Sequence, residues 1–137
     1  MLSSTARADI SATAAEVWAA LTSPAQTRRY LASLSITSAW QPDAHVDAHH
    51  GTTLVATGTV VVADSPSLLV YRLENPQTGD IDCWLDWHLD EAEPGTTRVT
   101  LTADTLPADP PVDVVRLLSS LKTYLETVKP RPGPSST

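Results

Sequence analysis

The chain has 137 residues, a net charge of −7 and 42% hydrophobic residues, which suits one globular domain with its own core. Nine basic residues against 16 acidic ones disfavour nucleic acids and anionic membrane surfaces as partners, because both are recognised by clustered Lys and Arg. A single cysteine excludes an intramolecular disulfide, no apolar run approaches the ~20 residues of a membrane span, and no secretory signal is apparent, so we expect a cytoplasmic protein.

The first 31 residues predict one strand followed by two helices. Apolar and polar residues alternate over 3–10, which favours a strand. Thr13 and Glu16 fit a capping box, in which the hydroxyl caps the first turn and the carboxylate reaches back, so a helix is expected over 14–21. A second short helix is expected over 24–31, because proline is tolerated at a first helical position.

The middle of the chain predicts strands separated by short turns. The strand-like segments are rich in β-branched or alternating residues and cover 36–40, 45–49, 54–63, 68–74, 82–90 and 98–102. Turns rather than helices join them, so the sheet should be mainly antiparallel and contain about six or seven strands.

The end of the chain predicts one long helix and a tail. Apolar residues recur at steps of three and four over 112–128, which is typical of an amphipathic helix. Residues 129–137 are rich in proline and have no apolar face, so we expect a disordered tail.

Several segments together resemble one protein family. Residues 10–22, ISATAAEVWAALT, resemble the opening of START-like (SRPBCC) domains, and within them the branch of heat-shock-protein-90 ATPase activator homologues. The turn, the two hairpins and the closing helix of that branch are matched by 38–43, by 58–60 with 68–71, by 95–101 and by 118–127. The resemblance covers nearly the whole chain and implies a START-like domain over 1–128. Its fold would be α+β, the helix-grip (START/Bet v-like) arrangement of a curved antiparallel sheet around a long C-terminal helix.

The resemblance also implies a cavity between the sheet and the closing helix. A pocket lined by apolar surface with a few polar tips is the usual site for a small molecule. By analogy with the fold we expect it to be lined by Trp40, Tyr71, Trp87, Leu89, Leu101, Leu118 and Leu121. The leading hypothesis is therefore binding of a hydrophobic or amphipathic small molecule, lipids included, without a cofactor.

Two polar clusters leave alternatives open. His45, Asp47 and His49 share one strand face, which suits either a transition-metal site or a solvated outer face. Asp86 and His88 share a face with Asp90 and Trp84, which suits either a general base or solvent exposure of that face. A shift of one residue in strand register would exchange the inner and outer faces.

Two single residues on the strands also have two interpretations each. Trp84 would be an interaction site or a cover over a neighbouring strand. Arg72 would pair with Glu74 on the outer face or meet a ligand carboxylate on the inner one.

Two further functions stay open at this point. The superfamily that the chain resembles includes polyketide cyclases and aromatases, and these enzymes need a His or a carboxylate inside the cavity. The superfamily also includes co-chaperones, and in that case Trp84 or the adjacent pair Arg28 and Arg29 would form the contact surface with a partner protein. The sequence leaves open whether the chain forms a homodimer. No nucleophile elbow, phosphate loop, Cys-x-x-Cys or His-Glu-x-x-His motif occurs, so the sequence names no catalytic residue.

Overall fold

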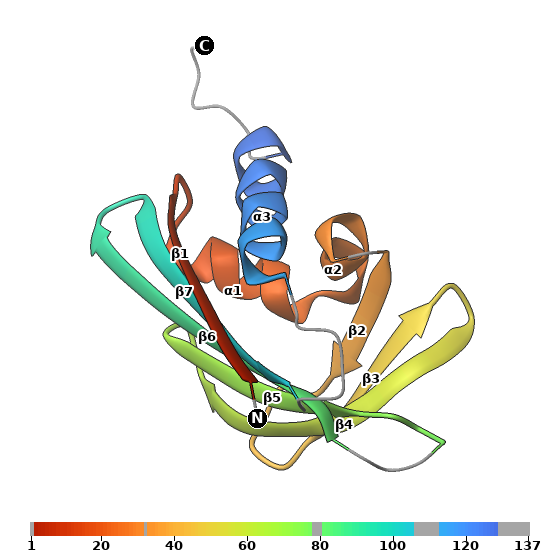
Figure 1. Cartoon of the computed structure of the whole chain (residues 1–137). Coiled ribbons are helices and arrows are strands. Elements are labelled where there is room, and N and C mark those ends of the chain that lie inside the picture. The colour runs from red at the N-terminus through yellow and green to blue at the C-terminus, as the bar shows by residue number, and fades with distance from the viewer. Residues whose placement is uncertain (1, 32, 78–80, 106–112, 129–137) are drawn as a thin grey trace.

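The computed structural model describes residues 2–31, 33–77, 81–105 and 113–128. These residues form a seven-stranded sheet and three helices (Figure 1). The strands are β1 (Leu2–Ile10), β2 (Leu34–Ser38), β3 (His45–His50), β4 (Thr53–Asp64), β5 (Leu68–Glu74), β6 (Ile81–Glu93) and β7 (Thr96–Thr105). The helices are α1 (Ala14–Thr22), α2 (Pro24–Tyr30) and α3 (Val114–Val128). The predicted α+β fold with a closing helix is confirmed.

The sheet is antiparallel throughout and has the order β1-β7-β6-β5-β4-β3-β2. It curves around the helices, and α3 lies along its concave side (Figure 1). The α3 helix packs on β1 and β7, whereas α2 packs on β2. The α1 helix also contacts the sheet, at β2, β6 and β7.

Local sequence signals determine where the helices begin. The capping box is confirmed: the Thr13 backbone N–H donates to Glu16 Oε1 at 2.8 Å, and the Glu16 backbone N–H donates to Thr13 Oγ1 at 3.1 Å. Asp113 caps α3 by accepting a hydrogen bond of 3.0 Å from the backbone N–H of Arg116. None of the helices in the described part of the chain has the length and apolarity that crossing a membrane requires.

Alternating burial along the strands confirms the predicted faces. In β6, Leu85, Trp87 and Leu89 are buried toward the helices, whereas Asp86 and His88 lie on the outer face. Val46 and Ala48 of β3 are buried in the same way, so the histidines and Asp47 beside them point outward.

Some boundaries differ from the prediction. Strand β2 ends at Ser38 rather than Trp40, because the backbone of Trp40 has a φ of 52°, which a strand cannot contain. Strand β7 is longer than expected, because it lies between β1 and β6 and its threonines complete both ladders. The predicted tail over 129–137 lies outside the described residues.

Candidate functional site

The seven expected lining residues come together on the concave side of the sheet. Strands β5, β6 and β7 provide Tyr71, Trp87, Leu89 and Leu101, and α3 provides Leu118 and Leu121; all of these are 6% exposed or less. Trp87 lies directly opposite Leu101 in the β6–β7 ladder. Trp40 packs against the same core but is only half-buried. Sequence positions spread over 82 residues thus converge on one apolar cluster.

Three aromatic residues provide the polar tips of this cluster. The rings of Trp40 and Tyr71 meet edge to face, with centroids 5.6 Å apart. Burial raises the pKa of the Tyr71 hydroxyl, so it stays neutral at physiological pH. The nearby indole N–H of Trp87 partly offsets this rise in the Tyr71 pKa. The indole nitrogen nevertheless does not meet the geometric criteria for a hydrogen bond.

Both indole nitrogens of this cluster are buried without a hydrogen bond. Neither Trp40 Nε1 nor Trp87 Nε1 has a hydrogen-bond partner among the residues that the structure describes. Buried polar atoms without partners are rare in native proteins, and each calls for a physical reason. The two free indole N–H groups, both close to the buried Tyr71 ring, can therefore donate hydrogen bonds to an acceptor on a ligand.

The loop after β2 presents Trp40 to the cluster. Its backbone N–H donates to Ser38 Oγ at 3.1 Å. Beyond Trp40 the loop is fixed to β4, because the Asp43 N–H donates to the Val60 carbonyl at 2.9 Å and Val60 returns a bond of 2.9 Å to the Ala44 carbonyl. A positive φ is rare for a bulky residue, and such strained conformations cluster at functional sites.

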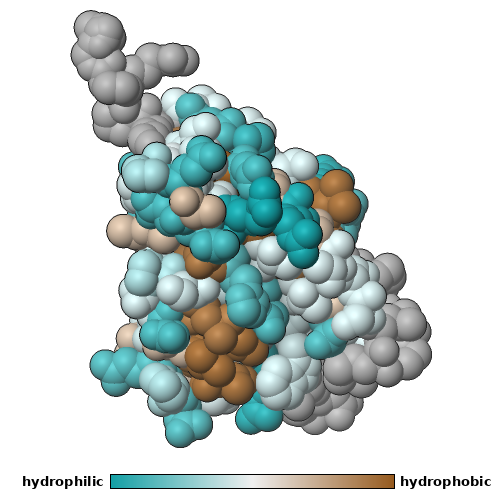
Figure 2. Space-filling view, turned by 90° about the vertical axis from the view of Figure 1, so that its left-hand side faces the viewer, coloured by the Kyte–Doolittle hydropathy of each residue, from teal (hydrophilic) through white to brown (hydrophobic). Residues whose placement is uncertain are grey.

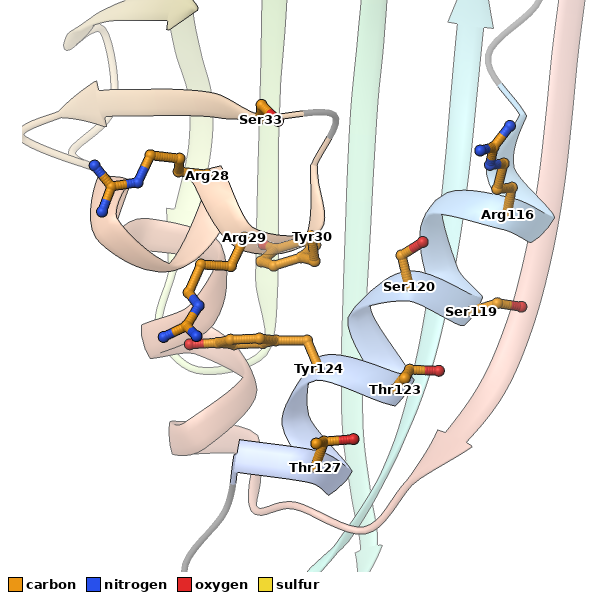
Figure 3. A pocket seen from close by; sticks show the side chains of 10 residues that line it. All are labelled: Arg28, Arg29, Tyr30, Ser33, Arg116, Ser119, Ser120, Thr123, Tyr124 and Thr127. Carbon is orange, nitrogen blue, oxygen red and sulfur yellow. The ribbon is translucent and has the colours of Figure 1, made fainter. Parts of the chain in front are cut away.

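A concavity of about 640 Å³ lies between α2 and α3 and was not predicted. We call it the α2–α3 groove. Its walls carry Arg28 and Arg29 from α2 and Arg116 from α3, together with several hydroxyl groups (Figure 3). The sequence marked Arg28 and Arg29 as an exposed pair, but only the packing of the two helices brings Arg116 into the same groove.

Aromatic side chains fix the two walls of the groove to each other. Tyr30 and Tyr124 stack with centroids 5.6 Å apart and an interplanar angle of 29°. The Tyr124 hydroxyl donates to Gln26 Oε1 at 2.9 Å, and the guanidinium of Arg29 lies 6.0 Å from the Tyr124 ring centroid. These contacts hold α2 against α3.

Comparison with known proteins identifies the family. Residues 11–126 match the family described as Activator of Hsp90 ATPase homolog 1-like protein. The chain belongs to this family. A search of curated proteins finds no match.

Solved structures share the fold of this Hsp90-activator-like chain at low sequence identity. CalU16 from Micromonospora echinospora is 19% identical, with a TM-score of 0.71 over 90% of this chain and 75% of its own. The Aha1 dimer from Colwellia psychrerythraea is 17% identical, with a TM-score of 0.69 over 95% of this chain and 100% of its own. DynU16, from the dynemicin biosynthetic locus, is 21% identical, with a TM-score of 0.65 over 93% of this chain and 48% of its own.

His45 of β3 in this family member belongs to a polar network on the outer face. His45 Nε2 lies 2.7 Å from Asp47 Oδ1 and 3.0 Å from Thr57 Oγ1. Within the described ranges, no group of three or more His, Cys, Asp or Glu residues is placed to hold a metal ion. The structure therefore favours the solvated interpretation of His45, Asp47 and His49.

Arg72 and Trp84 both lie on the outer face of β5 and β6. The Arg72 guanidinium lies over the Trp84 ring at 6.0 Å from its centroid, and Arg72 Nε is 3.6 Å from Glu74 Oε1. Arg72 thus lies outside, paired with Glu74, and Trp84 covers the neighbouring strand. Asp86 and His88 lie on this same outer face, with 3.8 Å between Oδ1 and Nε2, and so do not reach the inner cluster.

Apolar side chains also reach the molecular surface. One face of the molecule carries an apolar area surrounded by polar residues (Figure 2). On the outer side of the sheet, Val61 of β4 is 40% exposed, and Val62 and Val70 beside it are half-buried.

Proposed function

We propose that this chain binds a hydrophobic or amphipathic small molecule between the concave face of the sheet and α3. The observation that carries the proposal is the pair of buried indole N–H groups, on Trp40 and Trp87, that lack partners among the described residues. A buried donor left unpaired costs about 1–3 kcal/mol, so a ligand that accepts hydrogen bonds from these groups gains that free energy on binding.

The surroundings of the two indoles define the ligand. Leu89, Leu101, Leu118 and Leu121 offer apolar surface, and no charged residue is among the seven. A neutral, mainly apolar molecule with a carbonyl or ether oxygen therefore fits better than an ion. The place of DynU16, a protein of similar fold, in the dynemicin biosynthetic locus agrees with a small-molecule role.

We place the entry at Trp40. The other lining residues are packed against one another, so a ligand must displace a side chain to reach Trp87. Trp40 is the half-buried member of the set and has the strained backbone, so its ring is the one that moves at the lowest cost.

Titration with flavone, a neutral aromatic ketone, tests the proposal through quenching of tryptophan fluorescence. We expect saturable binding that Trp87→Phe weakens about tenfold, because one hydrogen bond to the ketone is lost. Trp18→Phe, on α1 and outside the aromatic cluster, should leave the affinity unchanged. Native mass spectrometry of freshly purified protein adds a search for a bound molecule. Absence of any bound molecule, together with no saturable quenching, would overturn the proposal.

The two alternative functions, an enzyme and a chaperone partner, have less support. A cyclase or aromatase would need a His or a carboxylate inside, and His45, His88 and Asp86 lie on the outer face. A chaperone partner stays a prediction that rests on the family description.

A further inference from the structure

The α2–α3 groove is separate from the proposed small-molecule site. None of the seven inner residues borders it, because α3 turns Leu118 and Leu121 toward the sheet and turns Ser120 and Thr123 toward the groove. The groove is polar: the described residues that line it include three arginines and no carboxylate. A ligand of the groove must therefore differ in chemistry from a ligand of the apolar cluster.

No carboxylate among the described residues neutralises the arginines of the groove. Elsewhere in the described residues three cations pair with carboxylates: Arg72 with Glu74, Arg98 with Asp9 and Lys122 with Glu126. Arg7 donates to the Thr100 hydroxyl instead. By contrast, Arg28, Arg29 and Arg116 form no ion pair with any described carboxylate. Three unpaired cations in one groove are unusual in a chain with a net charge of −7. They create a local positive potential that attracts anions.

Helix stability does not explain this arrangement. Arg28 and Arg29 occupy the last turn of α2, where a cation interacts favourably with the helix dipole. Arg116, however, lies in the first turn of α3, where a cation is unfavourable. Its position therefore points to a role outside its own helix.

The spacing of the arginines indicates more than one anionic group. Arg29 lies beside Tyr124, and Arg116 is two turns earlier on α3, so the two ends of the groove are about 12 Å apart along the helix axis. Ser120 and Thr123 lie between them on α3 and offer hydroxyl donors (Figure 3). One carboxylate cannot reach both ends, whereas a molecule with two or more anionic groups can.

The cationic walls are also held in place before any ligand binds. The Tyr30–Tyr124 stack and the Tyr124–Gln26 hydrogen bond fix the distance between α2 and α3. The contact of Arg29 with the Tyr124 ring restricts the guanidinium. Such preorganisation lowers the entropy lost on binding.

We propose that the α2–α3 groove binds a small polyanion that carries at least two phosphoryl or carboxylate groups. Arg29 contacts one anionic group, Arg116 contacts another, and the hydroxyls of α3 donate to the part between them. Arg28 adds positive charge to the α2 wall of the groove. The volume of about 640 Å³ suits a ligand of this size. This inference does not depend on the apolar site.

Isothermal titration calorimetry at low salt tests it, with tripolyphosphate as the phosphoryl probe and citrate as the carboxylate probe. We expect at least one probe to bind, and the one that binds more tightly identifies the anionic group. Arg29→Gln and Arg116→Gln should each weaken that binding about tenfold, while Arg116→Lys keeps most of it.

Arg7→Gln is the matched control, because it removes the same charge from the exposed outer side of β1. It should leave the affinity unchanged. Thermal unfolding of each variant checks that the fold is kept, and Arg116 is exposed, so its substitution should be tolerated. The proposal is overturned if neither probe binds at millimolar concentration, or if Arg7→Gln weakens binding as much as Arg116→Gln.

Discussion

Gly58 in β4 lies directly against the backbone of Arg72 in β5. A Cβ atom added at Gly58 would be 1.8 Å from the Arg72 carbonyl oxygen and 2.8 Å from its carbonyl carbon. Both atoms belong to a backbone that is paired in the sheet, so neither can move aside alone. The close approach of the two strands, just before the irregular pairing at Val60 and Val62, therefore requires glycine.

Gly58→Ala should destabilise the protein by about 2–3 kcal/mol, because the strands must separate to admit the methyl group. Gly51→Ala is the control: its added Cβ meets nothing within 4 Å, and only its φ of 63° carries a cost, of about 1 kcal/mol. Urea unfolding of the two variants measures the difference. Equal losses would show that the contact with Arg72 is relieved cheaply.

Thr27 connects α2 to β2 through a buried hydroxyl. The side chain is 1% exposed, accepts a bond of 3.0 Å from the Ile36 backbone N–H and donates to the Pro24 carbonyl at 3.3 Å. Thr27→Val should lower the free energy of unfolding by about 1–3 kcal/mol, because it leaves the Ile36 N–H buried and unpaired. Thr27→Ser keeps the hydroxyl and should retain more of the stability. Chemical unfolding that ranks the serine variant below the valine variant would contradict this role.

Local patterns in the sequence predicted most of the fold. The capping box at Thr13 and Glu16 depends on residues three apart, and the alternation in β6 follows directly from strand geometry. The end of β2 was predicted wrongly, because the positive φ of Trp40 is imposed by the loop and has no local signal. Likewise, β7 was predicted too short, since its partners β1 and β6 determine its length.

The candidate sites were less accessible from the sequence. The family resemblance predicted which residues share the concave core, but the unpaired state of the Trp40 and Trp87 nitrogens depends on three-dimensional packing. The α2–α3 groove joins Arg29 to Arg116 across 87 positions, and no short motif connects the two helices. Polar residues that come together only through long-range packing show no periodic pattern in the sequence.

Asp86 should make the protein less stable at neutral pH than at mildly acidic pH. Burial raises the pKa of its carboxyl, the interaction with His88 opposes the rise, and the nearby Asp104 adds to it. A pKa that is higher in the folded state than in the unfolded state means that the charged form opposes folding, and this penalty disappears as pH falls through the folded pKa. Asp86→Asn should therefore have a higher Tm than the wild type at pH 7, and the difference should vanish near pH 3.

Differential scanning fluorimetry across this pH range measures the effect. Glu93→Gln, an exposed carboxylate on the same strand, is the control for a general change in net charge. If both variants gain the same Tm, the stabilisation comes from net charge and not from the burial of Asp86.

Glu126 should have the opposite effect on the pH dependence. The ammonium group of Lys122, 2.7 Å from Glu126 Oε2, is the main cause that lowers the pKa of this carboxyl, and the Ser11 backbone N–H, at 2.9 Å, adds to it. Because the folded pKa lies below the unfolded value of 4.5, the carboxylate stabilises the fold above that pH, and the contribution is lost as pH falls through the folded pKa. Glu126→Gln should therefore be less stable than the wild type at pH 7, by about 0.5 kcal/mol for an exposed pair.

The two proteins should converge in stability as the pH falls through the folded pKa of Glu126, because the wild-type carboxyl is then protonated too. Urea unfolding at a series of pH values follows this convergence, with Asp64→Asn as a control at the exposed end of β4. Glu126 ties α3 to the end of β1, and Lys122 adds a hydrogen bond of 2.6 Å to the Asp9 carbonyl. A constant gap between wild type and Glu126→Gln at every pH would mean that the side chain stabilises α3 by packing and not by its charge.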